Sequence, residues 1–336
     1  MKALVYNRYG GPEVLQLAEV DTPVPRPGEV LIRVKAVSLN AYDWRMLRGS
    51  PFLVKARQGL LRPKNPILGA DIAGVVESVG TGAGADAAAS DGFQPGIEVF
   101  GCLEGCGVSG LAAGGLAQFV AAKPSVLAPK PPNLDFEQAA ALPMAGGTAL
   151  IAVRDVARVT PGMNVLVNGA AGGVGSFAVQ IAKALGANVT GVCGTNHTDL
   201  VTSIGADQAI DYSTTDFART GQTWDAIIDN VANRSVRDLR RALNPDGIIA
   251  SVGFTSMRRL VGVGLAAAAK KASKRVAMVT ADNKNNVHLK ALAAMVESGQ
   301  ITPIMGRSYT FDQAAGAFGY LELGHADGKI TIRLED

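Results

Sequence analysis

Residues 168–175, Asn-Gly-Ala-Ala-Gly-Gly-Val-Gly, have the types and spacing that bring a backbone close to a phosphate. The strand-like run 164–167 precedes them, and a helical pattern follows. Gly172 lets the backbone approach a pyrophosphate, Gly175 lets the helix pack closely on the strand, and the helix N-terminus offers N–H groups to the phosphates. Because these elements come in this order, the segment predicts a dinucleotide site rather than a purely structural turn, although Ala170 replaces the first glycine of strict GxGxxG. The predicted phosphate-binding residues are Ala171, Gly172, Gly173 and Val174.

The next strand, Asn188 to Val192, leads to the expected position of the adenosine ribose. NAD enzymes carry an Asp or Glu there, about 20 residues after the glycines, to bind the ribose 2′-OH. Thr195 occupies this position, and the absence of an acid that would repel a 2′-phosphate favours NADP. The sequence has no Lys or Arg between Ala184 and Ala218, so Thr195, Asn196 and His197 would supply neutral or weakly charged donors instead. NADPH is therefore the expected cofactor, with NADH less favoured.

Two later strand ends should lie at the carboxyl edge of the same parallel sheet, where ligands bind. Asn230 follows the strand Ala226 to Asp229, and Val252 and Phe254 end the strand that begins at Ile248. We predict that Asn230 contacts the cofactor and that Val252 and Phe254 line the nicotinamide pocket. Ordinary core packing is the alternative for Val252 and Phe254.

Strand and helix patterns alternate from about residue 136 to residue 300, which is typical of parallel βαβ units. The expected helices are 136–159, with breaks near Pro143 and Gly146-Gly147, then 174–185, 199–204 and 289–298; the expected strands are 164–167, 188–192, 208–211, 226–229, 248–252 and 277–280. Before residue 135, strands such as 30–37 and 72–79 alternate with Pro- and Gly-rich turns, and few helical patterns occur. The sequence therefore predicts an α/β protein with a mainly β domain and a doubly wound parallel sheet.

Composition limits the class of protein. The chain's 336 residues predict two domains, and its net charge of +3 does not point to nucleic acid or an anionic membrane. One basic cluster, formed by residues 258–259, 270–271 and 274–275, has no interleaved aromatic residues to stack on bases, so a solvated helix face is the expected interpretation. The best apolar run, Leu260 to Ala269, has about half of the ~20 residues needed to cross a bilayer. With three cysteines and no secretory signal, a cytoplasmic protein without nucleic-acid or membrane partners is expected.

Motifs along the whole chain resemble the medium-chain dehydrogenase/reductase superfamily, in its zinc-free quinone oxidoreductase-like branch. These motifs are residues 68–76, 114–120, 141–143, 169–175, 211–212, 243–247 and 324–330. No single motif is decisive, but their order is specific. The resemblance implies a GroES-like catalytic domain, residues 1–123 and 301–336, and a Rossmann domain, residues 124–300. It also implies a homodimer or a tetramer, of which we expect the homodimer.

Zinc-binding members of this family need a Cys, a Gly-His-Glu segment and a later Cys or acid as ligands of the catalytic metal. By motif, Asn40 stands where the Cys would be, and Ala70 and Asp71 stand where His and Glu would be. The structural zinc lobe needs four closely spaced cysteines, and this chain has only Cys102 and Cys106 there. Since zinc sites depend on thiolate and imidazole ligands, we expect no metal. The two cysteines are interpreted as buried or loop thiols rather than a redox pair.

The resemblance implies roles for five further residues. It places Tyr212 near the adenosine phosphate, and His325 and Ala326 over the cofactor; an exposed strand-end tyrosine and a solvent-exposed turn are the alternatives. It places Asn40 and Tyr42 at the floor of the active site. Asn40 would hydrogen-bond the nicotinamide ribose or the substrate, and Tyr42 would donate to the acceptor or form a pocket wall.

Neighbouring residues have two interpretations each. Asp43 belongs to the same segment, or instead holds Arg45 or Arg48 in a structural ion pair. Trp44, Phe52 and Leu53 shape substrate access or only pack.

Without a Lewis acid, reduction of a conjugated acceptor is favoured over alcohol dehydrogenation, because the developing enolate or hydroquinone charge is delocalised. We therefore predict an NADPH-dependent oxidoreductase that transfers hydride to a quinone or an α,β-unsaturated carbonyl compound. One alternative is an enoyl-thioester reductase, which applies the same chemistry to a substrate on a phosphopantetheine arm. Another is a non-catalytic NADPH-binding protein.

Overall fold

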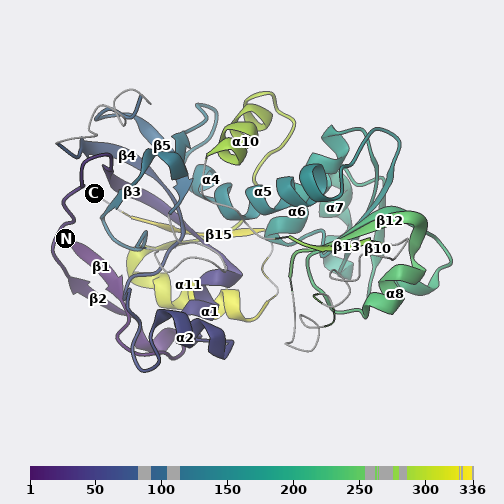
Figure 1. Cartoon of the computed structure of the whole chain (residues 1–336), viewed down its shortest axis with the longest axis horizontal. Coiled ribbons are helices and arrows are strands. Elements are labelled where there is room, and N and C mark those ends of the chain that lie inside the picture. The colour runs from purple at the N-terminus through teal and green to yellow at the C-terminus, as the bar shows by residue number, and fades with distance from the viewer. Residues whose placement is uncertain are drawn as a thin grey trace. The chain divides into compact units, whose positions relative to one another are not determined.

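The computed structural model describes residues 1–81, 92–103, 114–253, 262, 264, 275–279, 286–324, 326 and 328–334. The chain divides into two compact units, whose elements are labelled in Figure 1. Unit 1 comprises Met1–Met144, Ala281–Glu297 and Met305–Asp336, and unit 2 comprises Ala145–Thr280 and Ser298–Ile304. These limits differ from the predicted domain boundaries, because residues 124–144 and 281–297 group with unit 1 and residues 301–304 group with unit 2.

The segment after residue 123 belongs to unit 1 because its strand extends that unit's sheet. β7 (Leu127–Pro129) pairs antiparallel with β5 (Glu98–Cys102). Helix α10 (Val287–Glu297) is held in the same region, since Asn286 Nδ2 donates to the carbonyl of Leu127 at 2.8 Å. Neither contact is visible in local composition, because the partners are far apart along the chain.

Unit 2 is built on a six-stranded parallel sheet in the order β10-β9-β8-β11-β12-β13. Its strands are β8 (Asn164–Asn168), β9 (Asn188–Cys193), β10 (Gln208–Asp211), β11 (Trp224–Asp229), β12 (Leu243–Ser251) and β13 (Arg275–Met278). Val165, Leu166 and Val167 are fully buried, as expected for a sheet covered on both faces. Numbered along the chain, the order is 3-2-1-4-5-6, that of a dinucleotide-binding fold, so the predicted doubly wound sheet is confirmed.

Helices flank this sheet on both sides, with α6 and α7 on one side and α8 on the other (Figure 1). They are α6 (Gly173–Ala184), α7 (Thr198–Ser203) and α8 (Val236–Arg241). The predicted break near Pro143 is present, because α4 (Phe136–Ala140) ends before it and α5 (Pro143–Leu150) starts there. The expected break at Gly146-Gly147 is wrong: both glycines lie inside α5, which is buried along nearly its whole length and continues into a π-helical stretch, Ile151–Val156. Tertiary packing therefore overrides the low helix propensity of glycine there.

Unit 1 is built on a mostly antiparallel sheet in the order β14-β15-β3-β4-β5-β7, with β6 also paired to β3, and on a separate β1-β2 ribbon. Its other strands are β1 (Lys2–Val5), β2 (Gln16–Glu19), β3 (Val30–Leu39), β4 (Asp71–Val79), β6 (Phe119–Ala122), β14 (Met305–Thr310) and β15 (Lys329–Arg333). The mainly β character predicted for the first part of the chain is confirmed. The pairing of β15 with β3 places Ile330 opposite Leu39 and brings the two ends of the chain together.

Unit 1 also contains two early helices that the sequence patterns missed, α1 (Ala41–Arg48) and α2 (Phe52–Gln58). α1 begins at the N-cap Asn40 with a capping box to Asp43 and ends at Gly49, which has a φ of 61°. Two helical turns are too few for a clear hydrophobic period. The remaining long helix of this unit is α11 (Ala314–Glu322). Over the described ranges, no helix is both long and apolar enough for a membrane span.

Tyr6 is an exception within the hydrophobic core of unit 1. Its side chain is 1% exposed and packs edge-on against Tyr9, with ring centroids 6.3 Å apart. Its buried hydroxyl has no hydrogen-bond partner among the described residues, whereas the Tyr9 hydroxyl donates to the carbonyl of Gly59 at 2.7 Å. An unsatisfied buried hydroxyl costs stability.

Replacing Tyr6 by Phe should therefore raise the free energy of unfolding by about 1 kcal/mol, because it removes an unpaired polar group and keeps the ring. Urea denaturation measures this change. Tyr9→Phe is the matched control and should lower stability by a similar amount, since it deletes a made hydrogen bond. If Tyr6→Phe is as destabilising as Tyr9→Phe, the Tyr6 hydroxyl has a hydrogen-bond partner, which contradicts the expected gain in stability.

Candidate functional site

The glycine-rich turn joins the carboxyl end of β8 to α6. The N–H groups of Gly169 and Ala170 donate to the carbonyl of Val192 at 3.0 and 2.9 Å, which fixes the turn to the end of β9. Gly169 has a φ of 80°, a left-handed conformation that favours glycine. Gly172 is the N-cap of α6, and no side chain caps this end. The N–H groups of the first helical turn therefore suit an anion.

Two glycines of this turn differ in their surroundings. A Cβ on Gly175 would lie 1.9 Å from the carbonyl oxygen of Gly169, so only glycine lets α6 approach the strand this closely. A Cβ on Gly172 would lie 3.5 Å from the same oxygen, an ordinary contact. Packing within the protein therefore does not require glycine at 172, whereas close approach of a pyrophosphate does. The predicted residues Ala171, Gly173 and Val174 lie half-buried around this position, and the turn fits a dinucleotide.

Polar side chains gather where the strand order reverses, at the carboxyl ends of β8 and β11. Asn168 Nδ2 donates to Asp229 Oδ1 at 2.8 Å. Asn230 Nδ2 donates to the carbonyl of Asn168 at 3.1 Å, while its buried Oδ1 has no hydrogen-bond partner in the described part of the chain. An orphaned acceptor at a ligand-binding edge fits a donor such as a ribose hydroxyl. Val252 lies at the same edge, and its N–H donates to the carbonyl of Asp229 at 2.9 Å. Phe254 falls outside the described residues.

The expected ribose position carries an acid after all, supplied by the neighbouring strand. Asp211 is the last residue of β10 and pairs in register with Cys193, the last residue of β9. Thr195 Oγ1 donates to Asp211 Oδ2 at 2.6 Å, and the N–H of Ser213 donates to Oδ1 at 2.9 Å. These hydrogen bonds, that of Thr195 first, hold the pKa of Asp211 below its usual range. Asp211 is therefore ionised at neutral pH.

Tyr212 lies next to this acid. Its side chain is 54% exposed, and its hydroxyl would be 3.3 Å from a Cβ on Gly194, so it lies against the start of the ribose segment. Sequence reasoning placed Tyr212 near the adenosine but missed Asp211, because it searched for an acid only after the second strand. The sequence signal that could have revealed this acid is the pair Asp211-Tyr212 at the end of the third strand.

Unit 1 encloses a polar cluster at the junction of β3, β4 and β15. Lys329, 3% exposed, donates from Nζ to Asn40 Oδ1 at 2.6 Å and to the carbonyl of Leu39 at 3.3 Å. Asn40 Nδ2 donates to Asp71 Oδ2 at 3.0 Å, and the same oxygen accepts the N–H of Met144 at 3.0 Å. The predicted catalytic residue Asn40 thus has both ends of its amide engaged inside the protein. These bonds fix its orientation.

Asp43 adds a second buried carboxyl group to this cluster. Its oxygens accept the N–H groups of Asn40 at 2.8 Å and of Gly69 at 3.2 Å. Burial raises the pKa of Asp43 to about 7, and the nearby charge of Asp71 adds to the rise. Burial also raises the pKa of Asp71 and lowers that of Lys329, while the attraction between Lys329 and Asp71 opposes both shifts. Two carboxyl groups therefore share one buried ammonium.

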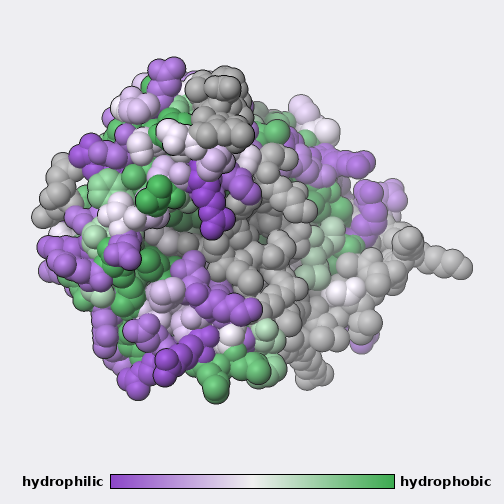
Figure 2. All heavy atoms as spheres, turned by 60° about the vertical axis from the view of Figure 1, so that its left-hand side comes forward, coloured by the Kyte–Doolittle hydropathy of each residue, from purple (hydrophilic) through white to green (hydrophobic). Residues whose placement is uncertain are grey.

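Tyr42, the second predicted catalytic residue, lies on α1 and packs half-buried against the core of unit 1, as does Trp44. Phe52, Leu60 and Leu61 near α2 are 71%, 61% and 88% exposed. Figure 2 shows one face of the molecule, on which hydrophobic and hydrophilic areas are interleaved. The side chain of Leu53 is outside the described residues.

The other predicted residues of unit 1 fall in or near its last segment. Ala326 packs partly buried against the core of unit 1, and His325 lies outside the described residues. Arg48 bonds Glu322 at 2.7 and 2.8 Å rather than Asp43, so an ion pair between Asp43 and Arg48 is wrong. Asp43 instead accepts backbone N–H groups because it closes the capping box of α1.

Comparison with known proteins gives two family matches. Residues 26–132 match the alcohol dehydrogenase GroES-like domain, and residues 204–332 match a zinc-binding dehydrogenase family. The whole chain is 31% identical to the chloroplastic quinone-oxidoreductase QR1 of Triphysaria versicolor, covering 99% of this chain and 98% of that protein. The chain belongs to the medium-chain dehydrogenase/reductase superfamily.

Two further members of this superfamily are informative. The chloroplastic NADPH-dependent alkenal/one oxidoreductase of Arabidopsis thaliana is 31% identical over 99% of this chain and 79% of that protein. The solved structure of the quinone oxidoreductase from Coxiella burnetii matches with a TM-score of 0.83 and 30% identity, covering 100% of this chain and 99% of that one. The predicted family and the GroES-like and Rossmann folds are confirmed.

The buried cluster of this superfamily member does not fit a zinc ion at the position that zinc-binding relatives use. By motif Asn40 and Asp71 occupy ligand positions, but both already bond within the cluster. The Lys329 ammonium, 2.6 Å from Asn40 Oδ1, offers no lone pair and would repel a divalent cation. Ala70 has no donor atom. Within the described ranges no group of three or more His, Cys, Asp or Glu is arranged to hold a metal; Cys102 is a buried thiol and Cys106 lies outside these ranges.

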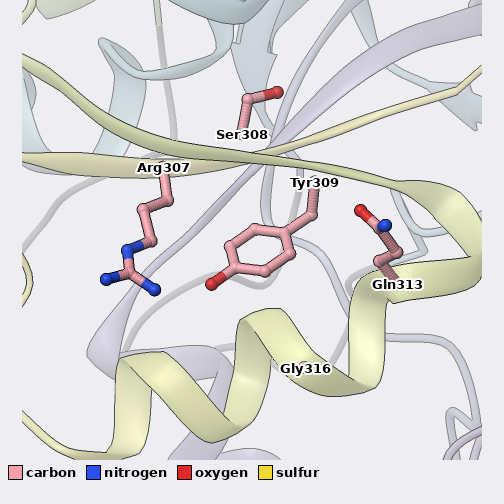
Figure 3. Close-up of a pocket in the computed structure, with 5 residues that line it drawn as sticks. All are labelled: Arg307, Ser308, Tyr309, Gln313 and Gly316. Atoms are coloured by element: carbon pink, nitrogen blue, oxygen red, sulfur yellow. The ribbon is translucent and has the colours of Figure 1, made fainter.

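A separate hollow of about 540 Å³ lies on the surface of unit 1, between β14 and α11. Arg307, Tyr309 and Gln313 point into it, whereas Ser308 points to the other face of the strand (Figure 3). The Arg307 guanidinium lies 4.1 Å from the ring centre of Tyr320. None of the predicted site residues lines this hollow, so we do not assign it to the reaction.

Proposed function

We propose that this protein is a zinc-independent reductase that uses NADPH, with NADH as the less favoured cofactor, to reduce a quinone or an α,β-unsaturated carbonyl compound. The turn 169–175 carries the proposal, because its open position at Gly172 and the uncapped N-terminus of α6 suit a pyrophosphate. Two relatives, a quinone-oxidoreductase and an NADPH-dependent alkenal/one oxidoreductase, support the proposed acceptor class and cofactor. When bound, the cofactor supplies a hydride from its nicotinamide ring.

In this proposal the cofactor is held along the carboxyl edge of the unit 2 sheet. The backbone of the turn holds the pyrophosphate, Asn230 Oδ1 accepts a donor of the nicotinamide half, and the ends of β9 and β10 receive the adenosine. The proposed cofactor-binding residues are Ala171, Gly172, Gly173, Val174, Thr195, Tyr212, Asn230, Val252, Phe254, His325 and Ala326.

On the acceptor side, the proposal assigns different tasks to Asn40 and Tyr42. The amide of Asn40 bonds Lys329 and Asp71, so it positions the start of α1. Tyr42, two residues later, is the proposed contact with the acceptor. A conjugated acceptor spreads its developing negative charge over several atoms, so the reaction does not depend on a Lewis acid.

The test is oxidation of NADPH and NADH by metal-stripped protein in the presence of para-benzoquinone, phenanthrenequinone or methyl vinyl ketone. We expect turnover that a chelator changes by less than about twofold, because no step is assigned to a metal. Absorbance of the reduced nicotinamide follows the reaction. Comparison of the turnover rates with the two quinones and with methyl vinyl ketone distinguishes quinone reduction from enone reduction.

Two results would contradict the proposal. Loss of turnover on chelation with recovery on adding zinc would overturn the zinc independence. Binding of NADPH without turnover of any acceptor would favour a non-catalytic binding protein or an enoyl-thioester reductase, which a thioester substrate then separates.

We further propose that the protein acts as a cytoplasmic homodimer on small molecules, without nucleic-acid or membrane partners. Light scattering tests the dimer, whose mass would be twice 34.6 kDa. Fractionation of cells tests the location.

A further inference from the structure

The two hydroxyl groups at the expected ribose position have their hydrogens committed inside the protein. Thr195 gives its single hydroxyl hydrogen to Asp211 Oδ2 at 2.6 Å. Ser213 Oγ lies 3.2 Å from Thr195 Oγ1, and the Ser213 side chain also hydrogen-bonds Asp211. Because the Thr195 hydrogen is already used, the Ser213 hydroxyl donates to Asp211 or to Thr195, and either bond keeps its hydrogen within the network. The backbone N–H of Ser213 is used as well, on Asp211 Oδ1 at 2.9 Å. This network, Thr195, Asp211 and Ser213, offers a ligand acceptors and a negative charge.

Such a network distinguishes the two nicotinamide cofactors. The ribose 2′-OH of NADH carries a hydrogen that it can donate to Thr195 Oγ1 or to the Asp211 carboxylate. The 2′-phosphate of NADPH carries close to two negative charges at neutral pH and accepts hydrogen bonds only. It therefore meets acceptors and a like charge. The segment between Ala184 and Ala218 contributes no Lys or Arg to this position.

We infer that Asp211 sets the cofactor preference of this protein by holding down its affinity for a 2′-phosphate, so that NADH is used alongside NADPH. The inference rests on the proposed dinucleotide site and narrows the preference for NADPH over NADH in the proposed function. Dinucleotide-binding folds ordinarily place the discriminating acid at the end of the second strand. Here the second strand, β9, leads to Thr195, and the acid reaches it from the end of the third strand, β10.

The test variant is Asp211→Asn, which removes the charge and keeps the shape of the side chain. Its amide oxygen can accept the N–H of Ser213, and its NH₂ group can donate to Thr195 Oγ1, which frees the Thr195 hydrogen for a phosphate. The probes are adenosine 2′,5′-bisphosphate and AMP, titrated calorimetrically. We expect the bisphosphate to bind about tenfold more tightly to the variant, because one like charge is removed within a few ångströms of its 2′-phosphate. AMP should bind no more tightly than to the wild type, because its 2′-OH loses a charged acceptor.

Asp207→Asn is the matched control, because it removes one negative charge from the same sheet at its opposite edge. Asp207 immediately precedes β10 and bonds Lys183 at 2.6 Å. Four residues of strand separate it from Asp211 by about 13 Å, beyond the screening length of ~8–10 Å at physiological salt. Affinities for both probes should stay at the wild-type values. Asp211→Ser provides a second neutral variant if Asp211→Asn is unstable.

The outcomes separate this inference from the proposed function. Tighter bisphosphate binding in the Asp211 variants, together with a higher kcat/KM for NADPH relative to NADH, supports the inference. Bisphosphate binding that matches Asp207→Asn in both Asp211 variants overturns it and leaves the reductase proposal standing. Absence of binding of AMP, the bisphosphate, NADH and NADPH to the wild-type protein overturns the proposed function itself.

Discussion

Replacing Lys329 by Met should lower the free energy of unfolding by about 3–5 kcal/mol, because it leaves buried carboxyl groups without their cation. Lys329 is 3% exposed, and its ammonium bonds Asn40 Oδ1 at 2.6 Å, while Asp71 and Asp43 are fully buried. Methionine matches the length of the lysine stem. The decrease in the free energy of unfolding therefore reflects the lost charge and hydrogen bonds more than lost packing. Urea denaturation at neutral pH measures the change.

A surface ion pair gives the matched control. Lys183 bonds Asp207 at 2.6 Å, but these side chains are 41% and 46% exposed, and Lys183→Met should cost no more than about 1 kcal/mol. Equal losses for Lys329→Met and Lys183→Met would contradict the importance of the buried cluster.

A double-mutant cycle with Asp71→Asn identifies the partner of Lys329. The hydrogen bonds from Asn40 and from the N–H of Met144 both reach Asp71 Oδ2, so the oxygen of an Asn at this position can keep these two bonds without the charge. The double variant should be more stable than the sum of the two single losses predicts, by about 1–3 kcal/mol. Additive losses would show that Lys329 and Asp71 are not coupled, and this comparison still holds if Lys329→Met alone is only marginally folded.

The elements of this protein that could be predicted are those determined by residues close together in the sequence. The strand 164–167 and the glycines after it lie within about a dozen residues of one another, so the turn and the start of α6 could be predicted from the sequence. The two turns of α1 carry too short a pattern, and α1 was missed. Its capping box, Asn40 with Asp43, is nevertheless a local signal that could have revealed the start of the helix.

The missed parts of the candidate site depend on contacts between distant residues. Asp211 accepts a hydrogen bond from Thr195 because β10 pairs with β9. The sequence of neither strand reveals the register of that pairing. Lys329 reaches Asn40 across 289 positions of sequence, because β15 pairs with β3. Motif comparison identified Asn40 and Asp71 as replacements for metal ligands, but only the pairing of β15 with β3 reveals the lysine that bonds Asn40.

Replacing Gly175 by Ala should weaken the binding of NADPH and NADH together and lower kcat/KM by about 100-fold, because the phosphate turn must move. The added Cβ would lie 1.9 Å from the carbonyl oxygen of Gly169, whereas unbonded heavy atoms prefer about 3.5 Å or more, so α6 and the turn must separate by more than about 1 Å. The same overpacking should cost about 1–3 kcal/mol of stability. Calorimetric titration with each cofactor and urea denaturation measure the two effects.

Gly172→Ala separates the packing effect from the ligand effect. Its Cβ would have 3.5 Å to the nearest atom, and its φ of −75° suits alanine, so no overpacking follows. Stability should fall by no more than about 1 kcal/mol, since alanine is a poorer N-cap than glycine. Cofactor binding should still weaken, because the new methyl group stands where the backbone must meet a pyrophosphate. Unchanged binding in Gly172→Ala would move the pyrophosphate away from this turn. Unchanged binding in Gly175→Ala would mean that the position of α6 does not set the geometry of the site.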